Sequence, residues 1–173
     1  MNKATVDLIK HFESLHDGDL HKIGLQPKMD SVGIYTEGWG RAMIDPTTKK
    51  FIKGIANADK AIKYQTIFTI ADADKALEDD LKTYSTFALN KLGNIVWDKL
   101  NDNQQGAVTS FVYNCGIGKP PYKLWTNIPL YINKGMSKDS LIAYWKKSVI
   151  KGGGKILKGL VLRRAAEATF FFS

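Results

Sequence analysis

Residues 13–41 have the sequence ESLHDGDLHKIGLQPKMDSVGIYTEGWGR, and the rest of the chain can be organised around them. The stretch opens on a carboxylate, Glu13, and continues into a polar loop. It ends in a segment with a second carboxylate, Asp30, a hydroxyl, Thr36, and glycine at positions 33, 38 and 40. Glycine in a strand-like segment marks tight turns and close backbone approach, so this segment predicts a hairpin.

The segment before this stretch is predicted to be a helix from Thr5 to His16, with Thr5 as its cap. Val6 and Glu13 are seven positions apart and therefore share the helix face that the apolar residues bury. Partial desolvation there would favour a protonated carboxyl, which suits a general acid. The alternative is an ordinary surface glutamate near a helix end, and the spacing leaves both open.

The next fifty residues are expected to hold a loop, a strand-like segment and turns. The polar segment from Asp17 to Asp30 predicts a loop that could contain a short strand, and Ile34 to Met43 is strand-like. A turn is expected over residues 45–48 and a short helix from Asp59 to Gln65.

The clearest helical pattern runs from Ile70 to Leu92, with Asp72 as its expected cap. Its length suits a helix that links two lobes. Further helices are predicted near residues 102–115, 123–134, 138–149 and 158–171, and the three glycines at 152–154 predict a flexible break. The last helix places Leu160, Arg164, Ala168 and Phe171 on one stripe.

These elements predict a mostly helical α+β fold that forms a single domain over residues 1–173. We expect a small N-terminal lobe with the hairpin at about residues 14–70 and a linking helix at about 72–92. A larger helical lobe would comprise about residues 95–173 together with the first helix, residues 5–16.

The composition indicates a folded protein with an anionic partner. The net charge is +8 and the pI about 9.4, with 44% hydrophobic and 24% charged residues. A positive field attracts nucleic acid, membrane surfaces or acidic cell-wall polymers. The basic residues are scattered, with short pairs only, so nucleic acid is disfavoured.

Other features exclude several classes. One cysteine, Cys115, permits no intramolecular disulfide, and its apolar context favours a small buried side chain. His11, His16 and His21 lack metal-ligand spacing, so no metal site is expected. The N-terminus does not resemble a signal peptide, and no apolar run is long enough for a transmembrane helix. The residues thus favour synthesis in the cytoplasm.

The two carboxylates at residues 13 and 30 suggest glycoside hydrolysis. That reaction needs a protonated carboxyl to protonate the leaving oxygen, and a second carboxylate that activates water or attacks the sugar. Glu13 on a buried helix face and Asp30 on a polar hairpin would supply the two environments. Thr36, six residues beyond Asp30, could hold the same water. Carboxylates near hairpins also act simply as caps or surface groups, and this alternative stays open.

Three blocks of sequence resemble the phage-type lysozyme family of endolysins, also called muramidases. The family pattern is a Glu that closes the first helix, then an Asp, then a hairpin G-x-x-T-x-G-x-G. This chain has Glu13, Asp30 and GIYTEGWG at residues 33–40. Residues 103–116, NQQGAVTSFVYNCG, resemble the family's central helix, and residues 159–167, GLVLRRAAE, resemble its C-terminal G-L-x-x-R-R-x-x-E helix.

The resemblance implies roles for particular residues. Glu13 would be the general acid, while Asp30 and Thr36 would activate the hydrolytic water. Arg163 would orient Glu13, although Arg163 and Glu167 could instead form a surface i,i+4 pair. Tyr113 and Asn114 would line the sugar cleft; alternatively, Tyr113 packs and Asn114 caps the helix. The four tryptophans could stack on sugars but are expected mainly in the core.

The function implied is hydrolysis of the β-1,4 bond between N-acetylmuramic acid and N-acetylglucosamine in peptidoglycan, with no cofactor. The enzyme would be a monomer made in the host cytoplasm that reaches the wall after release, with a holin as a possible partner. The alternative is a non-catalytic peptidoglycan-binding protein with the same fold. Membrane disruption by the cationic C-terminal helix, a chitin substrate, and transglycosylation are further alternatives.

Two departures from the family pattern bear on the site. Glu13 and Asp30 are separated by seventeen positions (30 − 13), which is wider than usual in the family. The additional residues include Asp17 and Asp19, which could compete with Asp30 for the second role. Arg41 stands where the family often has His, and this puts a local ion pair in doubt.

Overall fold

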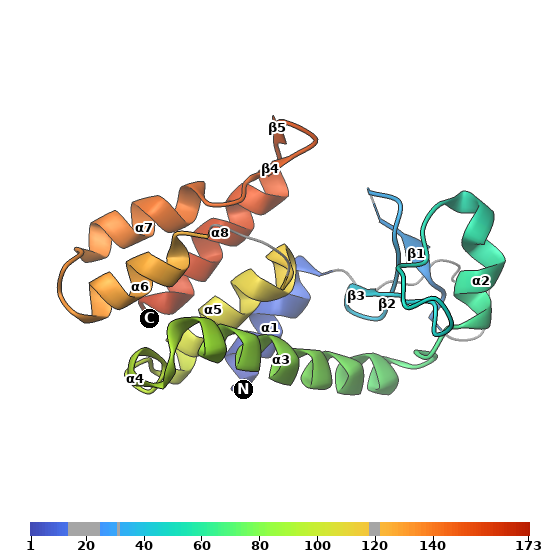
Figure 1. The fold of residues 1–173 in the computed structure, drawn as a ribbon, viewed down its shortest axis with the longest axis horizontal. Coiled ribbons are helices and arrows are strands. Elements are labelled where there is room, and N and C mark those ends of the chain that lie inside the picture. The colour runs from blue at the N-terminus through green and yellow to red at the C-terminus, as the bar shows by residue number, and fades with distance from the viewer. Residues whose placement is uncertain (14–24, 31, 118–121) are drawn as a thin grey trace. The chain divides into compact units, whose positions relative to one another are not determined.

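The structure, a computed structural model, describes residues 1–13, 25–30, 32–117 and 122–173 (Figure 1). The chain divides into two compact units: a smaller one, Glu13–Asp80, and a larger one that combines Met1–Phe12 with Leu81–Ser173. Helix α3, Ile70–Leu92, contributes its first half to the smaller unit and its second half to the larger. The fold is mostly helical with a small sheet, as the sequence predicts.

The smaller unit is built on a three-stranded antiparallel sheet in the order β1-β2-β3, with β1 at Lys28–Met29, β2 at Tyr35–Glu37 and β3 at Arg41–Ala42. A short 3-10 helix, η1 (Ile55–Asn57), leads into α2 (Ala58–Lys63). The strand-like pattern thus resolves into two strands joined at the glycines. Two apolar clusters hold the unit together: Tyr35, Met43, Ile52 and Ala61, and Leu25, Ile67, Ala73 and Ala76.

The polar contacts of the smaller unit tie the sheet to the chain that follows it. The Glu37 carboxylate is buried and accepts hydrogen bonds from Thr66 N at 2.9 Å, Thr66 Oγ1 at 2.7 Å and Ile67 N at 3.2 Å. Arg41 forms a two-point ion pair with Asp80, with Nε–Oδ2 at 2.9 Å and Nη2–Oδ1 at 2.8 Å. Arginine at position 41 therefore does form a local ion pair.

Helix α3 has the predicted bounds but a different cap. Thr69 Oγ1 accepts from Asp72 N at 3.1 Å, and Asp72 Oδ2 accepts from Thr69 N at 3.0 Å. This reciprocal arrangement is that of a capping box, with Thr69 as the cap and Asp72 three residues on. The prediction of Asp72 as the cap was wrong because both residue types favour helix starts.

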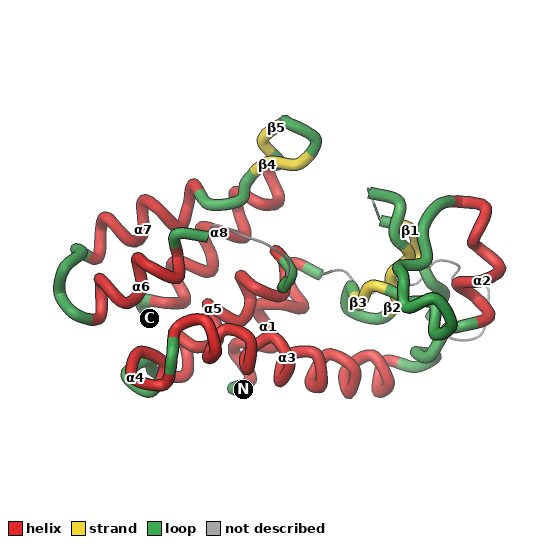
Figure 2. The backbone as a smooth tube through the Cα atoms, in the orientation of Figure 1, coloured by secondary structure: helices red, strands yellow, loops and turns green. Residues whose placement is uncertain are grey.

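The larger unit is a helical bundle around α5 (Asp102–Cys115). Helix α5 packs against α1 (Lys3–Phe12) and against α8 (Lys158–Phe171), which also packs on α7 (Lys138–Lys147). The short α4 (Asn94–Trp97) and α6 (Leu124–Ile132) complete the bundle, as Figure 2 shows. Large apolar side chains, among them Phe111, Leu124, Ile128, Leu141, Trp145 and Phe171, fill its core.

The bundle confirms the predicted bounds of α5 and α8 and corrects three other predictions. The cap of α1 is Asn2, whose Oδ1 accepts from Thr5 N at 2.9 Å, so Thr5 lies inside the helix and is buried. Gly153 and Gly154 form the tight turn between β4 (Lys151–Gly152) and β5 (Lys155–Ile156), where the sequence predicted a flexible break. The sequence predicted Glu13 on the buried face of the first helix, but α1 ends at Phe12 and Glu13 follows it. His16, the predicted end of that helix, lies outside the described residues.

Gly106 in α5 should tolerate no side chain. A Cβ at this position would lie 1.9 Å from Thr5 Oγ1 of α1 and 3.1 Å from Phe170 Cε1 of α8. We expect Gly106→Ala to lower the free energy of unfolding by about 1–3 kcal/mol, because overpacking outweighs the better helix propensity of alanine. The matched control is Gly159→Ala in α8, where nothing lies within 4 Å. This control should stabilise the fold by at most about 1 kcal/mol in denaturant unfolding. Equal effects of both changes would contradict the close packing of α1 on α5.

Asp45 should make the stability of the fold depend on pH in the acidic range. The Lys60 ammonium at 3.0 Å and the Thr47 amide lower the pKa of Asp45 to about 2. A lowered pKa favours the charged form in the fold, so its contribution is complete above about pH 4 and is lost as the pH falls towards 2. The difference in melting temperature between wild type and Asp45→Asn should therefore be constant from pH 5 to 7 and shrink below pH 4. The difference in melting temperature between wild type and Lys60→Gln should also shrink below pH 4. If the difference for either variant is the same at pH 2.5 and pH 6, the ion pair between Asp45 and Lys60 does not cause the pH dependence.

Candidate active site

Glu13 lies against the third glycine of the hairpin. It follows the last residue of α1 and its side chain is half-buried. Gly40 has φ +86°, and a Cβ there would come within 2.8 Å of Glu13 Oε2 and 3.4 Å of Glu13 Cδ. Only glycine suits both this backbone conformation and this contact. The structure therefore brings Glu13 and the hairpin together, as the sequence suggested.

Asp30 is held by the turn that it begins. Its Oδ1 accepts hydrogen bonds from Val32 N at 2.9 Å and Ile34 N at 2.8 Å. Its backbone N–H donates to Ile34 O at 2.8 Å, which closes the hairpin. In the described part of the chain, no group donates to Oδ2. Asp30 thus serves as a turn residue with one oxygen and keeps the other as an acceptor.

Thr36 is buried on β2, and its hydroxyl is oriented by β1. Thr36 Oγ1 donates to Lys28 O at 3.0 Å, and the two residues are partners in the sheet register. Asp30 follows β1 opposite Ile34, so Asp30 and Thr36 occupy one face as diagonal neighbours, which in regular geometry lie roughly 7–8 Å apart, with the Cβ atoms somewhat closer. Because its proton is used by Lys28 O, the Thr36 oxygen is left as an acceptor.

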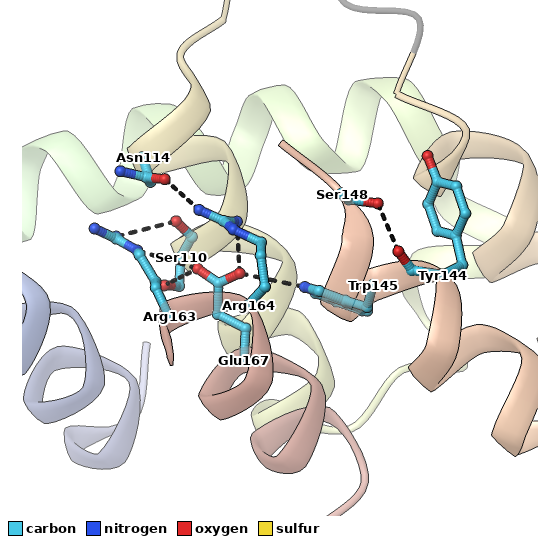
Figure 3. Close-up of polar contacts among 8 residues, drawn as sticks. All are labelled: Ser110, Asn114, Tyr144, Trp145, Ser148, Arg163, Arg164 and Glu167. Atoms are coloured by element: carbon cyan, nitrogen blue, oxygen red, sulfur yellow. Dashed lines mark hydrogen bonds and ion pairs between the residues drawn. The ribbon is translucent and has the colours of Figure 1, made fainter. Parts of the chain in front are cut away.

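Arg163 belongs to a buried polar network in the larger unit (Figure 3). The Glu167 carboxylate, fully buried, accepts from Ser110 Oγ at 2.9 Å and from Arg163 Nε at 3.2 Å on one oxygen. Its other oxygen accepts from Arg164 Nη1 at 2.6 Å and from Trp145 Nε1 at 3.2 Å. Arg163 is only 3% exposed, so the alternative of a surface pair between Arg163 and Glu167 does not hold. The i,i+4 spacing was correct, but it does not reveal burial.

The Arg163 guanidinium also lies over the ring of Phe12, with its carbon 5.7 Å from the ring centroid. Arg163 Nη2 donates to Ser110 O at 3.3 Å. These contacts place Arg163 beside the residue that immediately precedes Glu13 in the chain.

Asn114 and Tyr113 close α5. Asn114 Oδ1 accepts from Arg164 Nη2 and does not cap the helix, which ends with Gly116 at φ +80°. The Tyr113 ring meets the Tyr84 ring edge-on at 5.1 Å. Both Tyr113 and Asn114 are half-buried, so each keeps part of its side chain accessible.

The remaining candidates behave as side chains of the core or lie outside the described residues. Trp97 and Trp145 are buried, whereas Trp39 and Trp125 are half-buried. Burial raises the pKa of the Cys115 thiol to about 11, so the thiol is protonated at neutral pH and is a poor nucleophile. Asp17, Asp19, His16 and His21 lie outside the described residues. Within the described ranges, no three His, Cys, Asp or Glu side chains converge as a metal site would need, and no helix is both long and apolar enough to cross a membrane.

Sequence reasoning missed three residues that organise these groups. Arg164, Ser110 and Glu37 carry contacts that local spacing does not predict, because their partners lie 29 to 57 positions away. The sequence signal for Arg164 was its place beside Arg163 and three residues before Glu167, which fits one side of a helix.

Comparison with known proteins places the chain in a family. Residues 20–167 match the phage lysozyme family, a range that includes Asp30, Thr36, Tyr113, Asn114 and Arg163 but begins after Glu13, Asp17 and Asp19. The endolysin of Bacillus phage PZA is 29% identical over 130 residues, which are 74% of this chain and 46% of that protein. The endolysin of Bacillus phage B103 is 26% identical over 173 residues, which are 100% of this chain and 54% of that protein. The chain thus spans about half the length of these curated relatives.

The fold has relatives among solved structures. An endolysin from Escherichia coli O157:H7 phage FAHEc1 superposes with a TM-score of 0.66 at 21% identity, covering 99% of this chain and 92% of that one. This agreement supports the lysozyme-like α+β fold. Since the family match extends over most of the sequence, from residue 20 to Glu167 in the last helix, the chain belongs to the phage lysozyme family.

Proposed function

We propose that this protein is a muramidase that hydrolyses the β-1,4 bond between N-acetylmuramic acid and N-acetylglucosamine in peptidoglycan. The observation that carries the proposal is the contact of the Glu13 carboxylate with Gly40, on the hairpin that also holds Asp30 and Thr36. Membership of the phage lysozyme family and the names of the two endolysin relatives support it.

In the proposed reaction, Glu13 gives its proton to the glycosidic oxygen as the bond to the anomeric carbon breaks. A water molecule attacks that carbon from the opposite face, as an inverting mechanism requires. This water donates one hydrogen bond to Asp30 Oδ2, which accepts from no donor among the described residues, and one to Thr36 Oγ1, which leaves a lone pair for attack. Asp30 takes up the proton that the water loses and then releases it to solvent. Glu13 is protonated again from solvent, so both carboxyl groups return to their starting states.

The helical unit would supply support and substrate contacts. Arg163, held by Glu167 and placed over Phe12, would orient Glu13, and Tyr113 and Asn114 would contact the glycan. The net charge of +8 would draw the protein to the acidic wall. No cofactor takes part. We further propose that the protein acts as a monomer, is made in the host cytoplasm and is released to the wall with the help of a holin.

The other candidate functions predict different results. A non-catalytic wall-binding protein would bind purified peptidoglycan without releasing reducing ends. A transglycosylase would leave an anhydro product lighter by one water, and a chitinase would prefer chitin to peptidoglycan. Membrane disruption by the C-terminal helix is disfavoured, because Ala168 and Phe171 of α8 are buried in the core of the helical unit.

Removing either carboxylate should abolish clearing of a peptidoglycan suspension. We expect Glu13→Gln and Asp30→Asn each to lower the rate by about a hundredfold or more, because each removes a proton transfer. The asparagine can still accept from Val32 N and Ile34 N, so the hairpin should remain folded. Glu78→Gln and Asp59→Asn, two exposed carboxylates, serve as controls and should leave the rate unchanged. Full activity of folded Glu13→Gln would overturn the mechanism, and loss in Glu13→Gln alone would move the second role to Asp17 or Asp19.

A side chain at Gly40 should displace the Glu13 carboxylate. Gly40→Ala is expected to reduce the hydrolytic rate by at least about tenfold, since small misplacements of reacting groups are costly. The matched control is Gly54→Ala in the same unit, which has φ +84° and no neighbour within 4 Å. Both variants bear a backbone cost of roughly 1–2 kcal/mol, but only Gly40→Ala should lose activity. Equal rates for the two variants after correction for folded fraction would count against the role of this contact.

A further inference from the structure

The buried guanidinium of Arg164 is fixed on several sides. Its Nη1 donates to Glu167 Oε2 at 2.6 Å, and its carbon lies 4.6 Å from the centroid of the Phe111 ring. The side chain is 0% exposed. Its Nη2 donates to Asn114 Oδ1, across 50 positions of sequence (Figure 3). Arg164 therefore presents a fixed donor to the end of α5.

This donor decides which way the Asn114 amide faces. A guanidinium has only N–H donors, so the amide atom against it must be the acceptor, Oδ1. The Nδ2 group, with two N–H donors, is then turned away from Arg164. Asn114 is half-buried, and within the described residues its Nδ2 donates to no acceptor. An amide with one end anchored and the other end open is suited to bind an acceptor on a ligand.

We propose that Arg164 is a positioning residue for substrate binding, which holds Asn114 so that its Nδ2 donates to an acetamido carbonyl oxygen of the glycan. The inference rests on the proposed function, because it takes an N-acetylated sugar chain as the ligand. Asn114 Nδ2 can only donate hydrogen bonds, and a carbonyl oxygen can only accept them. Nδ2 therefore favours the acetamido carbonyl oxygen over an ammonium or an amide N–H of the ligand. The Phe111 ring and the Glu167 carboxylate contribute by keeping the guanidinium in one orientation.

The charge of the cluster makes a sharp test possible. Arg163, Arg164 and Glu167 are all buried and together carry a net charge of +1 (+2 − 1). Asn114→Asp would add a carboxylate of nearly the same shape that still accepts from Arg164 and offsets this charge. We therefore expect the melting temperature of Asn114→Asp to stay the same or rise. At the same time the variant has lost both N–H donors, so KM for peptidoglycan should rise about tenfold while kcat changes little.

Two controls separate the lost donor from other effects. Asn133→Asp makes the same chemical change on an exposed residue of the helical unit and should leave KM unchanged. Repeating the measurement in about 0.5 M salt screens repulsion between the new carboxylate and the acidic wall. A tenfold rise that persists in salt supports the lost donor, and a rise that disappears in salt overturns it.

Arg164→Lys tests whether the orientation of Asn114 depends on Arg164. An ammonium can still pair with Glu167 but does not reproduce the forked contact to both partners. We expect a higher KM with nearly unchanged kcat in Arg164→Lys, and no further rise when Arg164→Lys is added to Asn114→Asp. A purely structural role would lower the melting temperature of Arg164→Lys and leave KM of the folded enzyme at the wild-type value, which would refute the inference.

The test also separates this inference from the proposed function. If wild type does not hydrolyse peptidoglycan, the proposed function fails, and binding of soluble N-acetylglucosamine oligomers to wild type and Asn114→Asp is measured instead. Weaker binding by the stable variant supports the role of Asn114 and Arg164 without hydrolysis. Equal binding by the two proteins overturns it.

Discussion

The carboxylate of Glu167 is the polar centre on which the helical unit depends. A buried charge is tolerated only when hydrogen bonds replace its lost hydration, and Glu167 receives four of them. Its donors come from α5, α7 and α8, so a single carboxylate joins the three helices that enclose the apolar core. If one of these hydrogen bonds were lost, a buried polar group would be left without a partner. This cost holds the Arg163 and Arg164 side chains in one geometry.

A second constraint acts in the smaller unit, where glycine positions are set by contacts as well as by backbone conformation. A Cβ at Gly38 would lie 2.7 Å from Ile67 Cδ1 and 3.4 Å from Ala73 Cβ, against the start of α3. A Cβ at Gly40 would strike Glu13. The two glycines of G-x-G therefore have different neighbours. Gly38 packs against apolar side chains of the core, and Gly40 leaves room for the Glu13 carboxylate.

These contacts explain why some features could be predicted from sequence and others could not. The bounds of α3, α5 and α8 follow from apolar residues at helical spacing, which is a local property. The caps at Asn2 and Thr69 were missed because two or more suitable residues stand near each helix start. The burial of Arg163 and Glu167 is not local: an i,i+4 pair looks the same in sequence whether water or a bundle surrounds it. The contact between Arg164 and Asn114 depends on how α8 packs against α5, and no short motif encodes that packing.

Three polar side chains of the proposed site, Asp30, Thr36 and Asn114, share one property. In each, the scaffold occupies one hydrogen-bonding atom and thereby defines the chemistry of the other. Asp30 uses Oδ1 in its turn and offers Oδ2 as an acceptor; Thr36 gives its proton to Lys28 O and offers its oxygen; Asn114 gives Oδ1 to Arg164 and offers its Nδ2 donors. A nucleophilic water needs two acceptors to hold both its protons, and a sugar acetamido carbonyl needs a donor. The pattern of atoms left open thus matches the two partners that hydrolysis of an N-acetylated glycan requires, a match that follows from hydrogen bonds already present in the folded chain.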